Sequence, residues 1–143
     1  MKTKIVQIFI IIATFIVAII KMTDNTAKIV LHWDFMGNVT NYGNKYYIIF
    51  LPIIGILLYL VFLHYEKNPF KIHIPNTEKT TKNAKLLIRY IRVVEIVALS
   101  ILLYITLCSA QFLELQSLLI ITTILFIIIY YIYIYKKLVS GNV

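Results

Sequence analysis

Residues 29–45 read IVLHWDFMGNVTNYGNK, and this polar segment decides how the rest of the chain is organised. It holds the single tryptophan, Trp33, and two of the four glycines, Gly37 and Gly43. Its many Asn and Gly residues favour tight turns. Long apolar stretches flank it on both sides. Because a bundle of lipid-embedded helices does not need such a segment, we expect the functional residues to lie here.

The composition defines the class of protein. The chain has 143 residues, of which 61% are hydrophobic, and its mean hydropathy is +0.87. Soluble domains contain about 45–50% apolar residues. The single cysteine excludes an intrachain disulfide. Fourteen Lys and Arg residues against six acidic ones do not indicate nucleic-acid binding here, because basic residues in a membrane chain mark its cytoplasmic side.

The hydropathy pattern predicts an all-α integral membrane protein, a single domain of four transmembrane helices over residues 4–21, 46–65, 93–113 and 116–135. The first apolar run follows a basic start, as in a signal peptide, but no small-residue cleavage site follows it, so we expect an uncleaved helix. Residues 22–45 should form a structured extracellular loop. Residues 66–92 should form a cytoplasmic connector that becomes helical from about residue 76 and extends helix 3 into the cytoplasm.

The orientation follows from the basic residues. With four spans, 11 of the 14 lie on the side that holds both termini and the connector, and 3 lie on the side of the polar segment. The positive-inside rule therefore predicts cytoplasmic termini and an extracellular polar segment. Five basic residues recur on one predicted face of the connector helix: Lys79, Lys82, Lys85, Arg89 and Arg92. This basic stripe fits a surface that faces lipid phosphates, or a protein docking site.

The polar segment has three interpretations. In the first it is a folded cap over the outer ends of the helices, in which His32 and Asp34 bond turn backbone groups and the glycines supply positive-φ or close-approach positions. In the second, His32 and Asp34 bind a metal, but two ligands are too few for a closed site, and His64 and His73 lie on the opposite side of the membrane. In the third, Trp33, Tyr42 and the turns contact an extracellular peptide or protein.

Glu95 is the other candidate residue, because an ionisable group within a membrane span is a functional-site hypothesis by default. It follows Arg92 by three residues, a spacing that permits an ion pair on one helix. The sequence therefore predicts a structural Arg92–Glu95 pair or a Glu95 side chain that snorkels to the membrane surface. The alternative is a pathway for protons or a substrate.

The residues of the polar segment resemble the signature of SdpI-like bacterial membrane proteins, His-[Phe/Trp]-[Asn/Asp]-x-x-Gly followed by Tyr-Gly-x-Lys. The matching positions are His32, Trp33, Asp34, Gly37, Asn41, Tyr42, Gly43 and Lys45. The family's proline two residues before the histidine is Val30 here. The resemblance implies a multi-pass protein of the bacterial inner membrane, some of whose relatives protect their host against a secreted toxin or signal its presence. It implies no catalytic residues.

The leading hypothesis is thus a non-enzymatic membrane protein that acts in toxin immunity or signalling through its external cap, with no cofactor or metal. The sequence shows no Ser-His, Cys-His or metal-ligand constellation of the kind catalysis needs. The alternative is a small transporter or channel subunit with a polar path near Glu95. Its partners would be the lipid bilayer and an extracellular peptide or protein, and the sequence does not define an oligomeric state.

The predicted topology can be measured by cysteine labelling. Asn38→Cys should react with an impermeant maleimide in intact cells, because residue 38 lies in the extracellular segment. Thr80→Cys should react only after lysis. The unaltered chain, whose single cysteine is Cys108, is the control, and the reverse labelling pattern would overturn the orientation.

Overall fold

The computed structural model describes residues 2–72, 74–75 and 77–139. Within these residues, four helices are long and apolar enough to cross a membrane. They are α1 (Lys2–Thr23), α2 (Phe50–Lys67), α3 (Thr81–Ser109) and α4 (Ser117–Val139). Two strands, β1 (Lys28–Trp33) and β2 (Val39–Asn44), lie between α1 and α2. The short 3-10 helices η1 (Lys45–Ile49) and η2 (Pro69–Lys71) lie at either end of α2.

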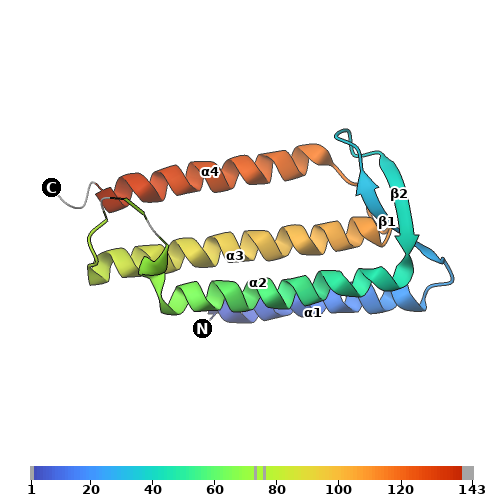
Figure 1. Ribbon diagram of the computed structural model, residues 1–143, viewed down its shortest axis with the longest axis horizontal. Helices are drawn as coiled ribbons and strands as arrows, with labels where there is room; N and C mark the ends of the chain where they lie inside the picture. The colour runs from blue at the N-terminus through green and yellow to red at the C-terminus, as the bar shows by residue number, and fades with distance from the viewer. Residues whose placement is uncertain (1, 73, 76, 140–143) are drawn as a thin grey trace.

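The four helices run along the long axis of the molecule, and the β-hairpin lies across one end of them (Figure 1). α3 is the central helix, because it packs against α1, α2 and α4. The N-terminal end of α1 and the C-terminal end of α4 lie at the end opposite the hairpin (Figure 1). We call the hairpin side the outer end of the bundle and the opposite side the inner end.

α1 is polar towards the bundle and apolar towards its surroundings, the reverse of a soluble helix. Its buried face carries Gln7, Ile10, Thr14, Ala18 and Lys21, spaced by three or four residues as one face of a helix requires. The other faces expose large apolar side chains; Phe9 is 69% exposed. Small and polar residues let membrane helices approach and bond one another. This arrangement is that of an integral membrane protein, whose surroundings are a lipid bilayer.

α2 approaches α3 closely through its own small face. Pro52 and Gly55 are buried, and a Cβ on Gly55 would lie 3.2 Å from the side chain of Leu102. α2 begins with η1, whose N-cap Asn44 accepts a hydrogen bond from the Tyr46 backbone N–H. The apolar helical run of η1 and α2 thus spans Lys45–Lys67.

α3 differs from the prediction at both ends. It begins at Thr81, where the Thr80 side chain caps the helix by accepting a hydrogen bond from the Asn83 backbone N–H. The predicted start near Asn76 is therefore too early, and Asn76 itself lies outside the described residues. At the outer end α3 stops at Ser109 instead of continuing to residue 113, and Gln111 there has a φ of 64°. This left-handed residue turns the chain away from the helix axis.

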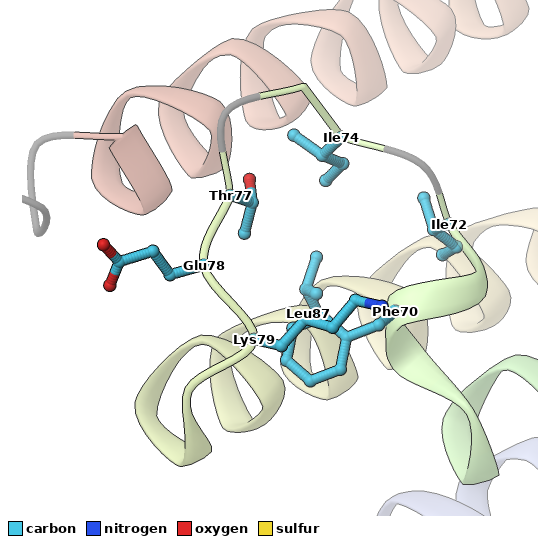
Figure 2. A pocket seen from close by; sticks show the side chains of 7 residues that line it. All are labelled: Phe70, Ile72, Ile74, Thr77, Glu78, Lys79 and Leu87. Atoms are coloured by element: carbon cyan, nitrogen blue, oxygen red, sulfur yellow. The ribbon is translucent and has the colours of Figure 1, made fainter.

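The connector between α2 and α3 packs on the inner ends of α3 and α4. Ile74 is buried in a cluster with Leu87, Ile134 and Leu138. A pocket of about 550 Å³ lies beneath the connector, with Ile74 and Leu87 projecting towards it, while Glu78 points away (Figure 2). Because its apolar walls belong to this cluster, the pocket reflects how the connector packs.

Arg92 pairs across helices and not along its own. Its guanidinium Nε lies 3.0 Å from Oε1 of Glu66 on α2, and its terminal nitrogen lies 3.2 Å from Oε2, so the pair is bidentate. The predicted Arg92–Glu95 pair is therefore wrong. The carboxylate of Glu95 is directed towards α1 instead, where the Gln7 side-chain amide donates to it over 2.6 Å.

A double-mutant cycle can measure this correction. Glu66→Gln and Arg92→Gln should each lower the melting temperature in detergent, and the double variant should lose less than the sum, with a coupling of about 0.5–3 kcal/mol. The matched cycle of Glu95→Gln with Arg92→Gln should be additive. Coupling in the second cycle and additivity in the first would restore the original pairing.

Candidate functional site

The tip of the hairpin is a turn held by Asp34. Its carboxylate accepts hydrogen bonds from the Asn38 backbone N–H (2.8 Å) and from the Asn38 side-chain amide (2.9 Å). The Asp34 carbonyl accepts a third from the Gly37 N–H over 3.0 Å. The two bonds from Asn38 hold the pKa of Asp34 below its usual value, because they favour the charged carboxylate.

Gly37 is the glycine that the turn requires. Its φ is +90°, a conformation that side-chain-bearing residues rarely adopt. A Cβ at this position would also lie 2.4 Å from the backbone carbonyl oxygen of Leu115, in the turn between α3 and α4. Gly43 has a different role. It has no left-handed φ, and a Cβ there would meet the Leu31 side chain of the opposite strand at 2.3 Å.

His32 lies at an irregularity of the hairpin. The register pairs Val30 with Tyr42 but His32 with Asn41, so Leu31 is an extra residue on β1, and a compensating shift follows before Trp33. Such bulges increase the local twist and redirect side chains. The His32 ring Nδ1 contacts the Thr40 hydroxyl, which also donates to the His32 carbonyl oxygen over 3.3 Å. The ring therefore bonds a side chain, not the backbone group predicted for it.

His32 and Asp34 have separate partners, and the structure does not bring them together with further ligands. In the described part of the chain, no three His, Cys, Asp or Glu side chains form a group that could hold a metal ion. His64 bonds Lys71 at the inner end of the bundle, and His73 lies outside the described residues.

The hairpin is fixed to the bundle through β1. The Ser109 hydroxyl of α3 donates to the Val30 carbonyl oxygen over 2.7 Å, and both residues are buried. The Gln111 side-chain amide donates to the Lys28 carbonyl oxygen over 3.2 Å. Ile29 packs into an apolar cluster with three residues from α1, η1 and the end of α3: Ala18, Ile48 and Ala110. These contacts make the hairpin an integral part of the bundle.

Two lysines fasten the segment between α1 and the hairpin, and sequence reasoning missed the role of one of them. Lys21 is only 2% exposed, and its ammonium group donates to the Thr26 hydroxyl over 2.7 Å and lies 3.4 Å from the Asp24 carboxylate. Lys45, a motif residue, donates to the Asp24 carbonyl oxygen over 2.6 Å. The sequence feature that could have predicted the role of Lys21 is the presence of Asp24 and Thr26, three and five residues later, where α1 ends.

A groove of about 700 Å³, which we call the outer groove, separates the hairpin from the turn between α3 and α4. The hairpin contributes Trp33, Met36, Gly37 and Tyr42, among others, and the turn contributes Gln111, Phe112, Leu113, Glu114 and Leu115. Three predicted motif residues, Trp33, Gly37 and Tyr42, thus meet here. Asn41 and Gly43 instead line a second hollow of about 520 Å³ along β2, which Tyr42 also lines.

Exposed apolar side chains extend the outer groove. Phe35 and Met36 at the hairpin tip are 82% and 80% exposed, and Phe112 and Leu113 of the facing turn are about half exposed. The turn is ordered by Tyr104, whose hydroxyl donates to the Glu114 carbonyl oxygen (3.2 Å) and accepts from the Gln116 N–H (2.8 Å). A groove with aromatic and apolar walls, polar backbone nearby and a fixed frame suits a peptide or a small protein segment.

Glu95 occupies a second site, in the interior of the bundle. Glu95 and Gln7 are each 1% exposed. The Gln7 amide satisfies one carboxylate oxygen, whereas the other, Oε1, has no hydrogen-bond partner among the described residues. An unsatisfied buried oxygen is rare in a folded protein.

The fold and these sites define an integral membrane protein, and comparison with known families adds one finding. Residues 9–56 match the domain of unknown function DUF1648. The match covers most of α1, the whole hairpin, η1 and the start of α2, so it contains all eight motif residues. Neither the comparison with curated proteins nor that with solved structures finds a match.

The two motif glycines should respond differently to substitution. Gly37→Ala should destabilise the protein by about 1–3 kcal/mol, because the turn requires a left-handed residue and the new Cβ would clash with backbone. Gly43→Ala should cost less, because the atoms it meets belong to the exposed, flexible Leu31 side chain. Melting temperatures in detergent test the order, and a greater loss for Gly43→Ala would contradict this account of the turn.

Proposed function

We propose that the chain is a non-enzymatic membrane protein of the SdpI-like kind, which recognises an extracellular peptide or small protein in toxin immunity or signalling. The observation that carries the proposal is the outer groove, where Trp33, Tyr42 and Met36 of the hairpin face the turn between α3 and α4. Aromatic side chains and methionine are enriched where proteins contact one another. The resemblance of the motif to SdpI-like proteins supports the same proposal.

The proposed orientation puts the outer groove outside the cell. The hairpin lies at the outer end, and the beginning of α1 and the end of α4 lie at the inner end (Figure 1). Eleven of the 14 Lys and Arg residues belong to these two ends and to residues 66–92. By the positive-inside rule the inner end faces the cytoplasm. The bacterial inner membrane is the location that follows from the family resemblance.

A transporter or channel subunit is the second candidate, and the buried Gln7–Glu95 pair favours it. Three other polar side chains on the inward faces of the helices donate hydrogen bonds to backbone carbonyl oxygens. Thr14 donates to the Ile10 carbonyl oxygen, Thr106 to that of Leu102 and Ser109 to that of Val30. Within the described residues, these hydroxyls do not join the Gln7–Glu95 pair in a continuous polar path, which supports recognition over transport.

Site-specific photocrosslinking tests the recognition proposal. A photoreactive phenylalanine analogue at Tyr42, which lines the outer groove and is 51% exposed, should crosslink a secreted peptide or protein in native membranes. The same substitution at Tyr46 is the matched control, since Tyr46 is 56% exposed and lies in η1, outside the groove. Adducts at Tyr46 alone, or at neither position, would contradict recognition through the groove.

A liposome flux assay on the wild type and Glu95→Gln separates the two candidates. Recognition without transport predicts no flux above protein-free vesicles. Flux that Glu95→Gln abolishes would establish the transporter.

A further inference from the structure

A groove of about 640 Å³ lies at the inner end of the bundle, between the beginning of α1 and the lower part of α3. Its lining carries three basic side chains, Lys85, Arg89 and Arg92, and three apolar ones, Ile88, Val93 and Ile96, with Thr3 of α1 beside them. The residue numbers rise from the inner end towards the middle of the bundle. Basic and apolar side chains alternate along the groove as far as Arg92, and beyond it only the apolar Val93 and Ile96 line the groove. The end nearer the middle of the bundle is therefore apolar and the inner end, which we call the mouth, is mostly basic. This is the polarity of a lipid.

The basic mouth lies at the level of the bilayer surface. α3 has 29 residues, which makes it about 43 Å long at 1.5 Å per residue. The hydrocarbon core is about 30 Å thick, so α3 extends beyond it. Thr3 lines the same groove, and the exposed apolar side chains of α1 begin two residues later, at Ile5. From these lengths we infer that Lys85 and Arg89 lie near the level of the lipid phosphates.

The mouth carries unneutralised positive charge. Arg92 is paired with Glu66, whereas no ion pair joins Lys85 or Arg89 to an acidic side chain within the described residues. Both side chains are exposed, and one helical turn separates them on the same face. A planar guanidinium beside an ammonium group is a good receptor for a phosphate diester, because both donate charge-assisted hydrogen bonds.

We propose that this groove binds one anionic phospholipid, with its phosphate between Lys85 and Arg89 and an acyl chain along Ile88, Val93 and Ile96. Two basic groups without acidic partners favour a headgroup with net negative charge over a zwitterionic one, and basic pockets between membrane helices are known to hold such headgroups. The site lies at the opposite end of the bundle from the outer groove and does not depend on the function proposed for it.

The test measures lipid retention by native mass spectrometry of the full chain in detergent, with phosphatidylglycerol and phosphatidylcholine as probes. The wild type should retain one phosphatidylglycerol in preference to phosphatidylcholine. The double variant Lys85→Gln/Arg89→Gln should bind phosphatidylglycerol at least about ten-fold more weakly than the wild type does. The matched control, Lys79→Gln/Lys82→Gln, removes the same charge from two exposed lysines just before and at the start of α3, outside the groove, and should bind as the wild type does.

Further measurements distinguish a bound lipid from a bound free phosphate and from diffuse surface charge. Millimolar inorganic phosphate should not displace the lipid, because it lacks the acyl chain that the apolar side chains of the groove hold. Equal weakening in both double variants would overturn the proposal in favour of diffuse surface charge, and equal retention of the two lipids would overturn it as well. If the groove double variant does not fold, Lys85→Gln against Lys82→Gln makes the same comparison with one exposed side chain each.

Discussion

The hydrogen bond from the Ser109 hydroxyl to the Val30 carbonyl oxygen links the β-hairpin to the helix bundle. Val30 is buried against the bundle, so its backbone carbonyl needs a hydrogen-bond partner within the protein. Ser109 provides one at the last residue of α3, and Gln111, just beyond it, donates to the Lys28 carbonyl oxygen. The position of the hairpin, the shape of the outer groove and the approach of Gly37 to the Leu115 carbonyl all depend on this attachment.

The interior of the bundle follows the same physical rule. Polar side chains point inwards because lipid surrounds the helices, and each must find a partner there. Thr14 and Thr106 bond the preceding turn of their own helices, whereas Gln7 reaches across to Glu95 and joins α1 to α3. Arg92 and Glu66 join α3 to α2 near the inner end. The two cross-helix links use neighbouring positions of α3, so this central helix fixes both of its neighbours.

Much of the helical architecture could be predicted from hydropathy, because membrane spans require long apolar runs. The hairpin strands could not. Ile29 and Val30 are buried in succession, and the extra residue Leu31 breaks the alternation that identifies a strand in sequence. The partner of Arg92 was missed for another reason. Spacing along one helix is visible in the sequence, whereas the pairing of Arg92 with Glu66 depends on how α2 and α3 pack. The turn residues of the motif were recognisable from composition, but only the backbone shows that Gly37, and not Gly43, needs a positive φ.

The packing of α4 determines how much of its surface faces lipid. Its two buried residues, Ile134 and Leu138, both lie in the last two turns at the inner end, where they meet the connector and α3. No residue in the part of α4 nearer the hairpin is buried. At its outer end α4 is joined to α3 through the turn before it, where the Tyr104 hydroxyl bonds Glu114 and Gln116. Of the four membrane-spanning helices in the described residues, α4 has the smallest buried share, so lipid must cover a larger part of its surface than of any other helix.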